Sequence, residues 1–198
     1  AVGGTLYTGE MFPASFRGKF IAGDLLGHAV QWHYLKPYGS SFVSGYGGEL
    51  LTAHDDWFAS TDVTQGPDGA IYVADWYDER TAHPDPDAEW DRSNGRIYRI
   101  EYGEMKPKPV GDLDLATFPK LPTPRLISLL GHKNGWLARK ARQILADRRD
   151  PEAILSLRTL VMESKNDQLA LEAFWALYVS GGFNETFAEK TLLHRHPA

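Results

Sequence analysis

The side chains best suited to chemistry gather in one segment of this sequence, residues 75–95. Carboxylates, an imidazole, a guanidinium and aromatic rings are the groups from which catalytic and ligand sites are built. A segment of this length exceeds a common hairpin loop, and long loops on rigid scaffolds often carry function. Its ionisable, amide and aromatic residues include Asp75, Trp76, Tyr77, Asp78, Arg80, His83, Asp85, Asp87, Glu89, Trp90, Asp91 and Asn94.

Alternating acids in this segment fit a calcium ion, which takes roughly six to eight oxygen ligands. Asp85, Asp87, Glu89 and Asp91 stand at every second position. The pattern differs from an EF-hand, because Trp90 occupies the place of the loop glycine. Strictly alternating acids on an extended segment also fit a solvated surface, so both interpretations stay open.

Histidines and aromatic rings allow two further kinds of chemistry. His83 and His28 suit proton transfer, because imidazole titrates near neutral pH, although either could serve as a structural hydrogen-bonding residue. Trp76 and Tyr77 could stack on a quinone or a sugar ring, or pack between sheets. Core packing is the prediction for Trp32, Tyr34, Tyr72 and Tyr98.

A repeat of 51 residues positions these groups. Asp68-Gly69-Ala70-Ile71-Tyr72-Val73-Ala74-Asp75 repeats the pattern of Arg17-Gly18-Lys19-Phe20-Ile21-Ala22-Gly23-Asp24. Each copy reads as a glycine turn, a strand and a terminal aspartate, and the period is typical of a β-propeller blade. The first copy closes the loop after its aspartate in a few residues, which include His28. The sequence therefore predicts about two blades, with residues 75–95 on the face where propellers bind ligands.

Composition divides the chain into three parts. Short aromatic and β-branched runs between glycine and aspartate turns predict propeller strands over residues 1–104. Prolines crowd residues 105–124 and predict a linker. Residues 125–198 have helical periodicity, with Thr123 and Asp150 as expected N-cap residues.

The helical part also repeats. Aligning residues 138–161 with 170–193 superposes Ala141 on Ala173, Leu145 on Leu177 and Leu155 on Phe187. A period of 32 residues with two helices per unit indicates an α-solenoid. An ordinary small helical bundle is the alternative. The predicted fold class is thus a partial β-propeller followed by an α-solenoid.

Composition also excludes several classes of protein. With 26 acidic residues against 21 basic ones and a net charge of −5, the chain has little to attract nucleic acid. No signal sequence or transmembrane run is recognisable. The absence of cysteine rules out disulfides and a C-x-x-C-H haem attachment within these residues.

Several motifs distributed along the chain carry a resemblance to a known family. They include Gly4-Thr5-Leu6-Tyr7-Thr8-Gly9, Phe12-Pro13, Gly23-Asp24, Asp56-Trp57-Phe58, Gly66-Pro67-Asp68-Gly69 and Asn94-Gly95-Arg96-Ile97-Tyr98-Arg99-Ile100. With them, the chain resembles the membrane-bound dehydrogenase family of planctomycetes and verrucomicrobia over nearly its whole length. The Asp-Trp-Tyr-Asp extension at residues 75–78 is the more specific part of the likeness, and Leu129-Leu130-Gly131-His132 is similar to the start of that family's helical part.

The resemblance implies a propeller similar to quinoprotein sugar dehydrogenases, HEAT-like repeats, and a periplasmic or membrane-associated location. It implies oxidation of a sugar or polyol with pyrroloquinoline quinone and Ca²⁺, with electrons passing to a cytochrome c. The catalytic residues would be His83 and Asp75. The expected cofactor contacts are Trp76, Tyr77, His28 and Asp24, and the expected metal ligands are Asp78, Asp85, Asp87 and Asp91.

Two alternatives complete these expectations. Two blades do not enclose a central cavity, so these residues alone are expected to be inactive. A different class of protein also fits: a non-catalytic scaffold whose propeller binds carbohydrate and whose helical repeats dock a protein partner.

Overall fold

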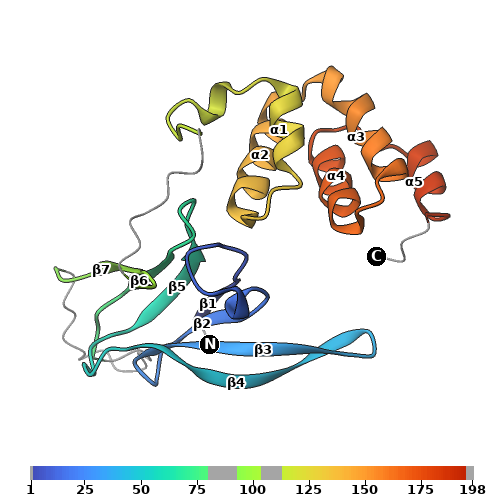
Figure 1. The fold of residues 1–198 in the computed structure, drawn as a ribbon. Coiled ribbons are helices and arrows are strands. Elements are labelled where there is room, and N and C mark those ends of the chain that lie inside the picture. Colours follow the sequence, from blue (N-terminus) through green and yellow to red (C-terminus); the bar gives the residue numbers. More distant parts are fainter. Residues whose placement is uncertain (1, 80–92, 104–112, 195–198) are drawn as a thin grey trace, which may run out of the picture. The chain divides into compact units, whose positions relative to one another are not determined.

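The computed structural model describes residues 2–79, 93–103 and 113–194. The chain forms two compact units, Ala1–Lys108 and Pro109–Ala198. The described residues contain two antiparallel sheets and five α-helices, so this is a mixed β and α protein (Figure 1). No helix among them is long and apolar enough to cross a membrane.

The first sheet has four antiparallel strands in chain order. They are β1 (Val2–Leu6), β2 (Phe20–Asp24), β3 (Ala29–Tyr38) and β4 (Ser41–Thr52). A 3-10 turn, Ala14–Phe16, lies in the connection from β1 to β2. The residues from 24 to 29 make a tight turn, in which the Asp24 carboxylate accepts the Gly27 N–H at 3.0 Å.

The second sheet has the order β5-β6-β7 in the described residues. Its strands are β5 (Ser60–Gln65), β6 (Ile71–Asp75) and β7 (Arg96–Ile100). Strand β6 lies 51 positions after β2 at both of its ends, as the sequence repeat predicts. In the registers, Asp24 is opposite Ala29 and Asp75 is opposite Arg96, so β3 and β7 are equivalent strands.

Side chains from both sheets meet in one apolar core. Ile21 and Val30 of the first sheet and Val63 and Val73 of the second are almost fully buried there. Strands β1 and β2 both contact β5. The sheets approach each other closely at Gly23, where an added Cβ would lie 2.2 Å from Ser60 Oγ. Only glycine permits that spacing between the sheets.

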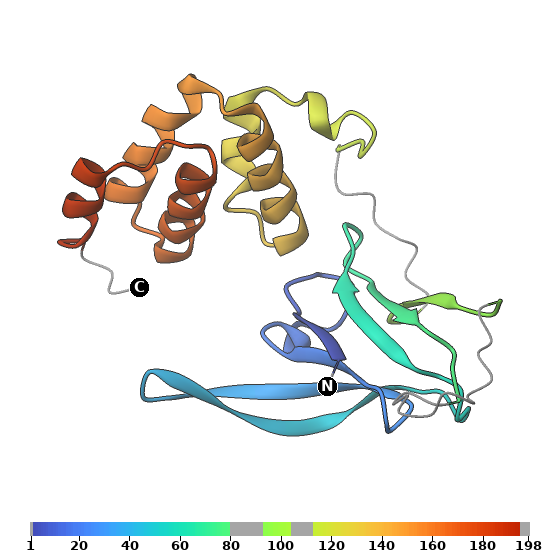
Figure 2. The ribbon, with the colours of Figure 1, turned by 180° about the vertical axis from the view of Figure 1, so that it is seen from behind.

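The hairpin of β3 and β4 continues past the rest of its sheet (Figure 2). Strand β2 pairs with β3 only as far as His33, whereas β3 and β4 stay paired to Tyr38 and Ser41. This ribbon changes one sequence prediction. Tyr34 is 37% exposed rather than a core residue, because no third strand or second sheet covers that part of β3 in the described residues.

The second unit contains α1 (Thr123–Leu129), α2 (Gly135–Arg148), α3 (Pro151–Glu163), α4 (Asp167–Val179) and α5 (Glu185–Thr191). Consecutive helices pack as pairs, α1 with α2 and α3 with α4. Equivalent helices also pack on each other, α1 on α3 and α2 on α4. One core runs through the unit, with Leu126, Leu145, Leu157 and Leu177 fully buried.

Helix α4 begins 32 residues after α2, and their N-caps are equivalent. The side chain of Asn134 accepts the Trp136 N–H, and that of Asn166 accepts the Leu169 N–H. Asp150 caps α3, as expected. Thr123 does not cap α1: it is the first helical residue, and its hydroxyl donates to Asp150 at 2.6 Å.

The end of the expected linker belongs to the helical unit. Residues Phe118–Lys120 form a 3-10 turn in which Phe118 is 1% exposed. Leu113 and Leu121 pack against the helical core. Burying these apolar side chains outweighs the proline content that predicts a linker over residues 105–124.

Candidate functional site

Three connections meet at one end of the two sheets: the turn from β2 to β3, the connection from β4 to β5, and the start of the loop after β6. Hydrogen bonds join them. His28 Nδ1 lies 2.8 Å from the Phe58 carbonyl oxygen. The Asp78 N–H donates to the Trp57 carbonyl at 2.9 Å, and the Trp76 N–H donates to the Ala59 carbonyl at the same distance. The predicted residues of these connections therefore share one region.

Asp75 is the centre of this region. Its carboxylate is 4% exposed, and Oδ1 accepts the N–H groups of Ala59 and Tyr77, both at 2.9 Å. These bonds fasten the start of the long loop to the start of β5. The other oxygen, Oδ2, is buried and has no hydrogen-bond partner in the described residues. The hydroxyl of Ser60, opposite Asp75 in the register, is also buried, and no described residue forms a hydrogen bond with it. Buried polar atoms are normally satisfied, so this pair is an exception that needs a cause.

Tyr77 is held in a stack. Its ring lies 5.6 Å from that of Trp57, and the Arg96 guanidinium lies 3.9 Å from the centre of the same ring. The neighbouring Trp76 is 54% exposed, and its indole N–H donates to Asp78 Oδ2 at 2.9 Å. The Trp76 ring is therefore oriented by a buried carboxylate while it faces solvent, as a stacking surface requires.

His28 has a defined tautomer. The Phe58 carbonyl can only accept, so Nδ1 carries the proton and Nε2 keeps its lone pair in the neutral ring. Asp24 stabilises the same turn, because Oδ1 accepts the Gly27 N–H and Oδ2 accepts the Gln31 amide at 2.9 Å. Both oxygens of Asp24 are thus engaged, unlike those of its repeat partner Asp75.

Backbone strain is concentrated at this end of the sheets. In the described part of the N-terminal unit, the non-glycine residues with positive φ are His28 (52°), His54 (51°) and Tyr77 (55°). One belongs to each of the three connections. Left-handed backbone costs roughly 1–2 kcal/mol for such residues and often marks functional sites.

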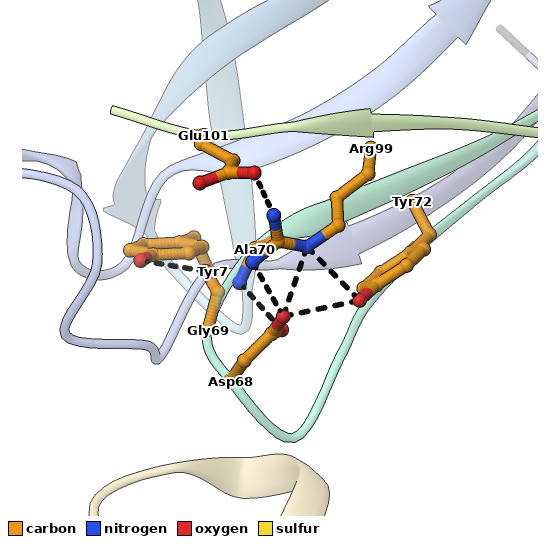
Figure 3. Close-up of polar contacts among 7 residues, drawn as sticks. All are labelled: Tyr7, Asp68, Gly69, Ala70, Tyr72, Arg99 and Glu101. Atoms are coloured by element: carbon orange, nitrogen blue, oxygen red, sulfur yellow. Dashed lines mark hydrogen bonds and ion pairs between the residues drawn. The ribbon is translucent and has the colours of Figure 1, made fainter. Parts of the chain in front are cut away.

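A second polar network lies at the opposite end of β6 (Figure 3). Asp68 Oδ2 accepts from the Tyr72 hydroxyl at 3.0 Å and from Arg99 Nη2 at 2.8 Å, and Arg99 also pairs with Glu101. Nearby, the buried Tyr7 hydroxyl donates to the Gly69 carbonyl at 3.0 Å. This network ties the turn between β5 and β6 to β7 and to the first sheet, so its role is structural.

The charge of Asp68 makes this network sensitive to pH. Burial opposes ionisation, but hydrogen bonds from the Ala70 N–H, Arg99 and Tyr72 outweigh it, so the pKa of Asp68 lies below its ordinary 3.8. The carboxylate therefore contributes stability that is complete above pH 3.8 and is lost as pH falls through the lowered pKa.

We expect Asp68→Asn to lower the free energy of unfolding by about 1–2 kcal/mol at pH 7, because Arg99 loses its charged partner and both side chains are partly exposed. Below pH 3.8 the difference from the unmodified chain should shrink. Urea unfolding at pH 7 and at pH 3 measures it, with the exposed Asp62→Asn as the matched control. A loss that is equal at both pH values would contradict the prediction.

Several predicted site residues, His83, Asp85, Asp87 and Asp91, lie outside the described residues. Among residues 2–79, 93–103 and 113–194, no three histidine, aspartate or glutamate side chains form a group that could hold a metal ion. The structure brings Asp24, His28, Asp75, Trp76, Tyr77 and Asp78 to one end of the sheets. Sequence reasoning missed the Arg96 and Trp57 stack on Tyr77.

A family model described as "Domain of unknown function (DUF7133)" matches residues 1–104, which is more than half of the 198 residues. The chain belongs to the DUF7133 family. The DUF7133 match takes in both sheets and the candidate site. No curated protein and no solved structure matches the chain.

Proposed function

We propose that the N-terminal unit is two adjacent blades of a larger β-propeller. Equivalent faces of the two sheets support this. Val30, opposite Gly23, is fully buried against the second sheet, whereas the equivalent Ile97, opposite Ala74, is 77% exposed. The opposite faces show the reverse. Val73 of the second sheet is fully buried between the sheets, whereas Leu6 and Tyr46 on the outer face of the first sheet are 47% and 58% exposed. Each sheet leaves open the face that is covered in the other, as expected when further blades continue the stack.

The helical unit fits a pair of HEAT-like repeats. The 32-residue spacing of α2 and α4, their equivalent asparagine caps, and the packing of α1 on α3 and of α2 on α4 support this. An ordinary bundle has no need for equivalent helices to stack in two layers.

For the activity, we propose that the complete protein is a quinone-dependent dehydrogenase of a sugar or polyol that passes electrons to a cytochrome c. The reaction type follows from the family resemblance. The observation that supports a ligand site is the buried Asp75 carboxylate, one oxygen of which has no hydrogen-bond partner among the described residues. A carboxylate that is buried and incompletely bonded lowers stability, so its presence here favours a role toward a ligand. Strain at His28, His54 and Tyr77 around it supports the same location.

The described residues do not by themselves fit a calcium ion or a quinone. No three metal-ligating side chains meet among them, and Asp78 Oδ2 already accepts from the Trp76 indole. Asp75 Oδ2 would be one ligand or hydrogen-bond acceptor. His28 Nε2 would be a second group with a lone pair, fixed by the bond from Nδ1 to Phe58.

The test uses the complete propeller protein, incubated with pyrroloquinoline quinone and calcium, and follows dye reduction with a panel of aldoses and sugar alcohols. We expect reduction that depends on the cofactor and is lost in Asp75→Asn. The exposed Asp62→Asn, which removes a carboxylate from β5 outside the candidate site, should keep the activity. If no substrate is oxidised by the folded, cofactor-treated protein, the dehydrogenase proposal fails.

A non-catalytic scaffold is the second candidate, and exposed rings on α4 favour it. Trp175 is 40% exposed and Tyr178 is 63% exposed, on a helix whose other side is buried. Such rings are typical anchors for a protein partner. A pull-down would use a chain that includes the helical unit and would compare it with the Trp175→Ala variant. A partner that binds the first and not the variant would separate this function from the redox one.

A further inference from the structure

The ribbon of β3 and β4 has a side-chain arrangement that the candidate site does not use. Strand β3 has ten residues and spans roughly 30 Å. The arrangement lies toward the end of β3 that is far from His28. One face of the ribbon carries Trp32, Tyr34, Lys36 and Tyr38, because side chains alternate along β3. We define these four residues and Lys19 as the ribbon face.

Two rings of the ribbon face lie over glycines of the neighbouring strand. A Cβ at Gly45 would lie 2.1 Å from the Tyr34 ring, and a Cβ at Gly47 would lie 2.1 Å from the Trp32 ring. Each ring therefore lies across a glycine of β4, in the space that a side chain would otherwise fill. Tyr34 is 37% exposed in this position. Flat, partly exposed rings form stacking surfaces, whereas rings that insert into a bilayer point away from the backbone.

Lysines accompany these rings. Lys19 Nζ lies 5.6 Å from the centre of the Trp32 ring and 6.0 Å from that of Tyr34. Lys36 Nζ lies 5.3 Å from the centre of the Tyr34 ring on its own strand. No aspartate or glutamate occurs in the sequence between Asp24 and Glu49, although the chain has a net charge of −5. The ribbon is therefore a locally positive, aromatic surface on an acidic protein.

We propose that the ribbon face binds an anionic glycan. A sugar ring would stack on Tyr34, and carboxylate or sulfate groups of the same glycan would pair with Lys19 and Lys36. Trp32 packs against Phe16 and the apolar core and supports the ribbon from below. The exposed Tyr38 (74%) extends this surface toward the tip. Two lysines on a chain of net negative charge are too few for the phosphate contacts of a nucleic acid. The inference stands apart from the proposed redox activity, because a different part of the chain carries it.

The experiment measures binding of the full chain to three glycans: polygalacturonate, dextran sulfate and neutral dextran. We expect binding to at least one anionic glycan, weakened by added NaCl, and no binding to neutral dextran. Tyr34→Ala should weaken binding by about tenfold or more. Lys36→Gln should weaken it by roughly three- to tenfold, and Tyr34→Phe, which keeps the flat ring, should change it by less than about twofold.

The matched control is Tyr46→Ala, which removes an exposed ring from the opposite face of the same ribbon. It should leave binding unchanged. Equal loss in Tyr46→Ala and Tyr34→Ala would overturn the proposal. So would tighter binding to single-stranded DNA or to phosphatidylserine vesicles than to either anionic glycan. Comparing the two anionic glycans distinguishes carboxylate from sulfate recognition. Far-UV circular dichroism checks folding, and Lys36→Gln decides the matter if Tyr34→Ala does not fold.

Discussion

Replacing Asp75 by asparagine is expected to leave the N-terminal unit folded, with a free energy of unfolding within about 1 kcal/mol of the unmodified chain. Asparagine keeps an oxygen that can accept the Ala59 and Tyr77 N–H groups, and it replaces the other, unpartnered oxygen of the charged carboxylate by a neutral amide NH2 group. Asp75→Ala should instead destabilise by about 2–4 kcal/mol, because both N–H groups lose a charged acceptor in a buried site.

Hydrogen exchange separates these outcomes at the level of single amides. In Asp75→Ala, the amides of Ala59 and Tyr77 should exchange faster, while those of β2 should keep their rates relative to global unfolding. In Asp75→Asn, both amides should stay protected. If asparagine were as destabilising as alanine, the second oxygen would have a structural role, and the argument for a ligand at Asp75 would fail.

Leu145→Ala and Leu177→Ala are expected to destabilise the helical unit by similar and large amounts, about 2–5 kcal/mol each. The two side chains lie 32 residues apart on α2 and α4, and both are fully buried. Equivalent burial in stacked helices predicts equivalent cavities. Thermal unfolding followed by circular dichroism at 222 nm would measure both, since the helices dominate that signal.

Leu155→Ala is the control for these variants, because Leu155 is 75% exposed on α3. It should change the free energy of unfolding by no more than about 0.5 kcal/mol. If Leu177→Ala lowered the free energy of unfolding much less than Leu145→Ala, the second pair of helices would be packed less tightly than the first. That result would contradict the structural equivalence of the two helix pairs.

The repeats were the most informative part of the sequence for the fold. The 51-residue period places β6 on β2, and the 32-residue period places α4 on α2. The superposition of Leu155 on Phe187 is wrong, because one is exposed and the other buried. Helix α5 begins two residues later than the 32-residue period predicts, so Phe187 corresponds to the buried Ala153: each is the third residue after its N-cap, Asn184 and Asp150.

Strand β4 could not be read from local propensity. The glycines of β4 lower the strand preference of residues 41–52. Two rings of β3 compensate, because Tyr34 lies across Gly45 and Trp32 lies across Gly47. That compensation depends on a neighbouring strand and not on the local sequence. The wrong prediction of Tyr34 as a core residue has the same origin, because the sequence does not indicate that β3 extends beyond the end of β2.

The candidate site was only partly predictable for a similar reason. Asp75 could be found because the repeat marks it, whereas its unpartnered oxygen depends on where Ala59 and Ser60 lie. The stack of Arg96 on Tyr77 follows from the register of β6 with β7 and from the positive φ of Tyr77. Neither feature has a local signature in the sequence.

The contact between Tyr34 and Gly45 also makes position 45 a means of adjusting the ring without changing its chemistry. A methyl group there would lie 2.1 Å from the ring, and since a ring at the end of a side chain can rotate away, the tyrosine would tilt off the strand. Substitution at Gly45 would then alter the angle of the ring in graded steps with the size of the new side chain. The two positions should consequently change together, a glycine at 45 accompanying an aromatic residue at 34 and a larger residue accompanying its loss.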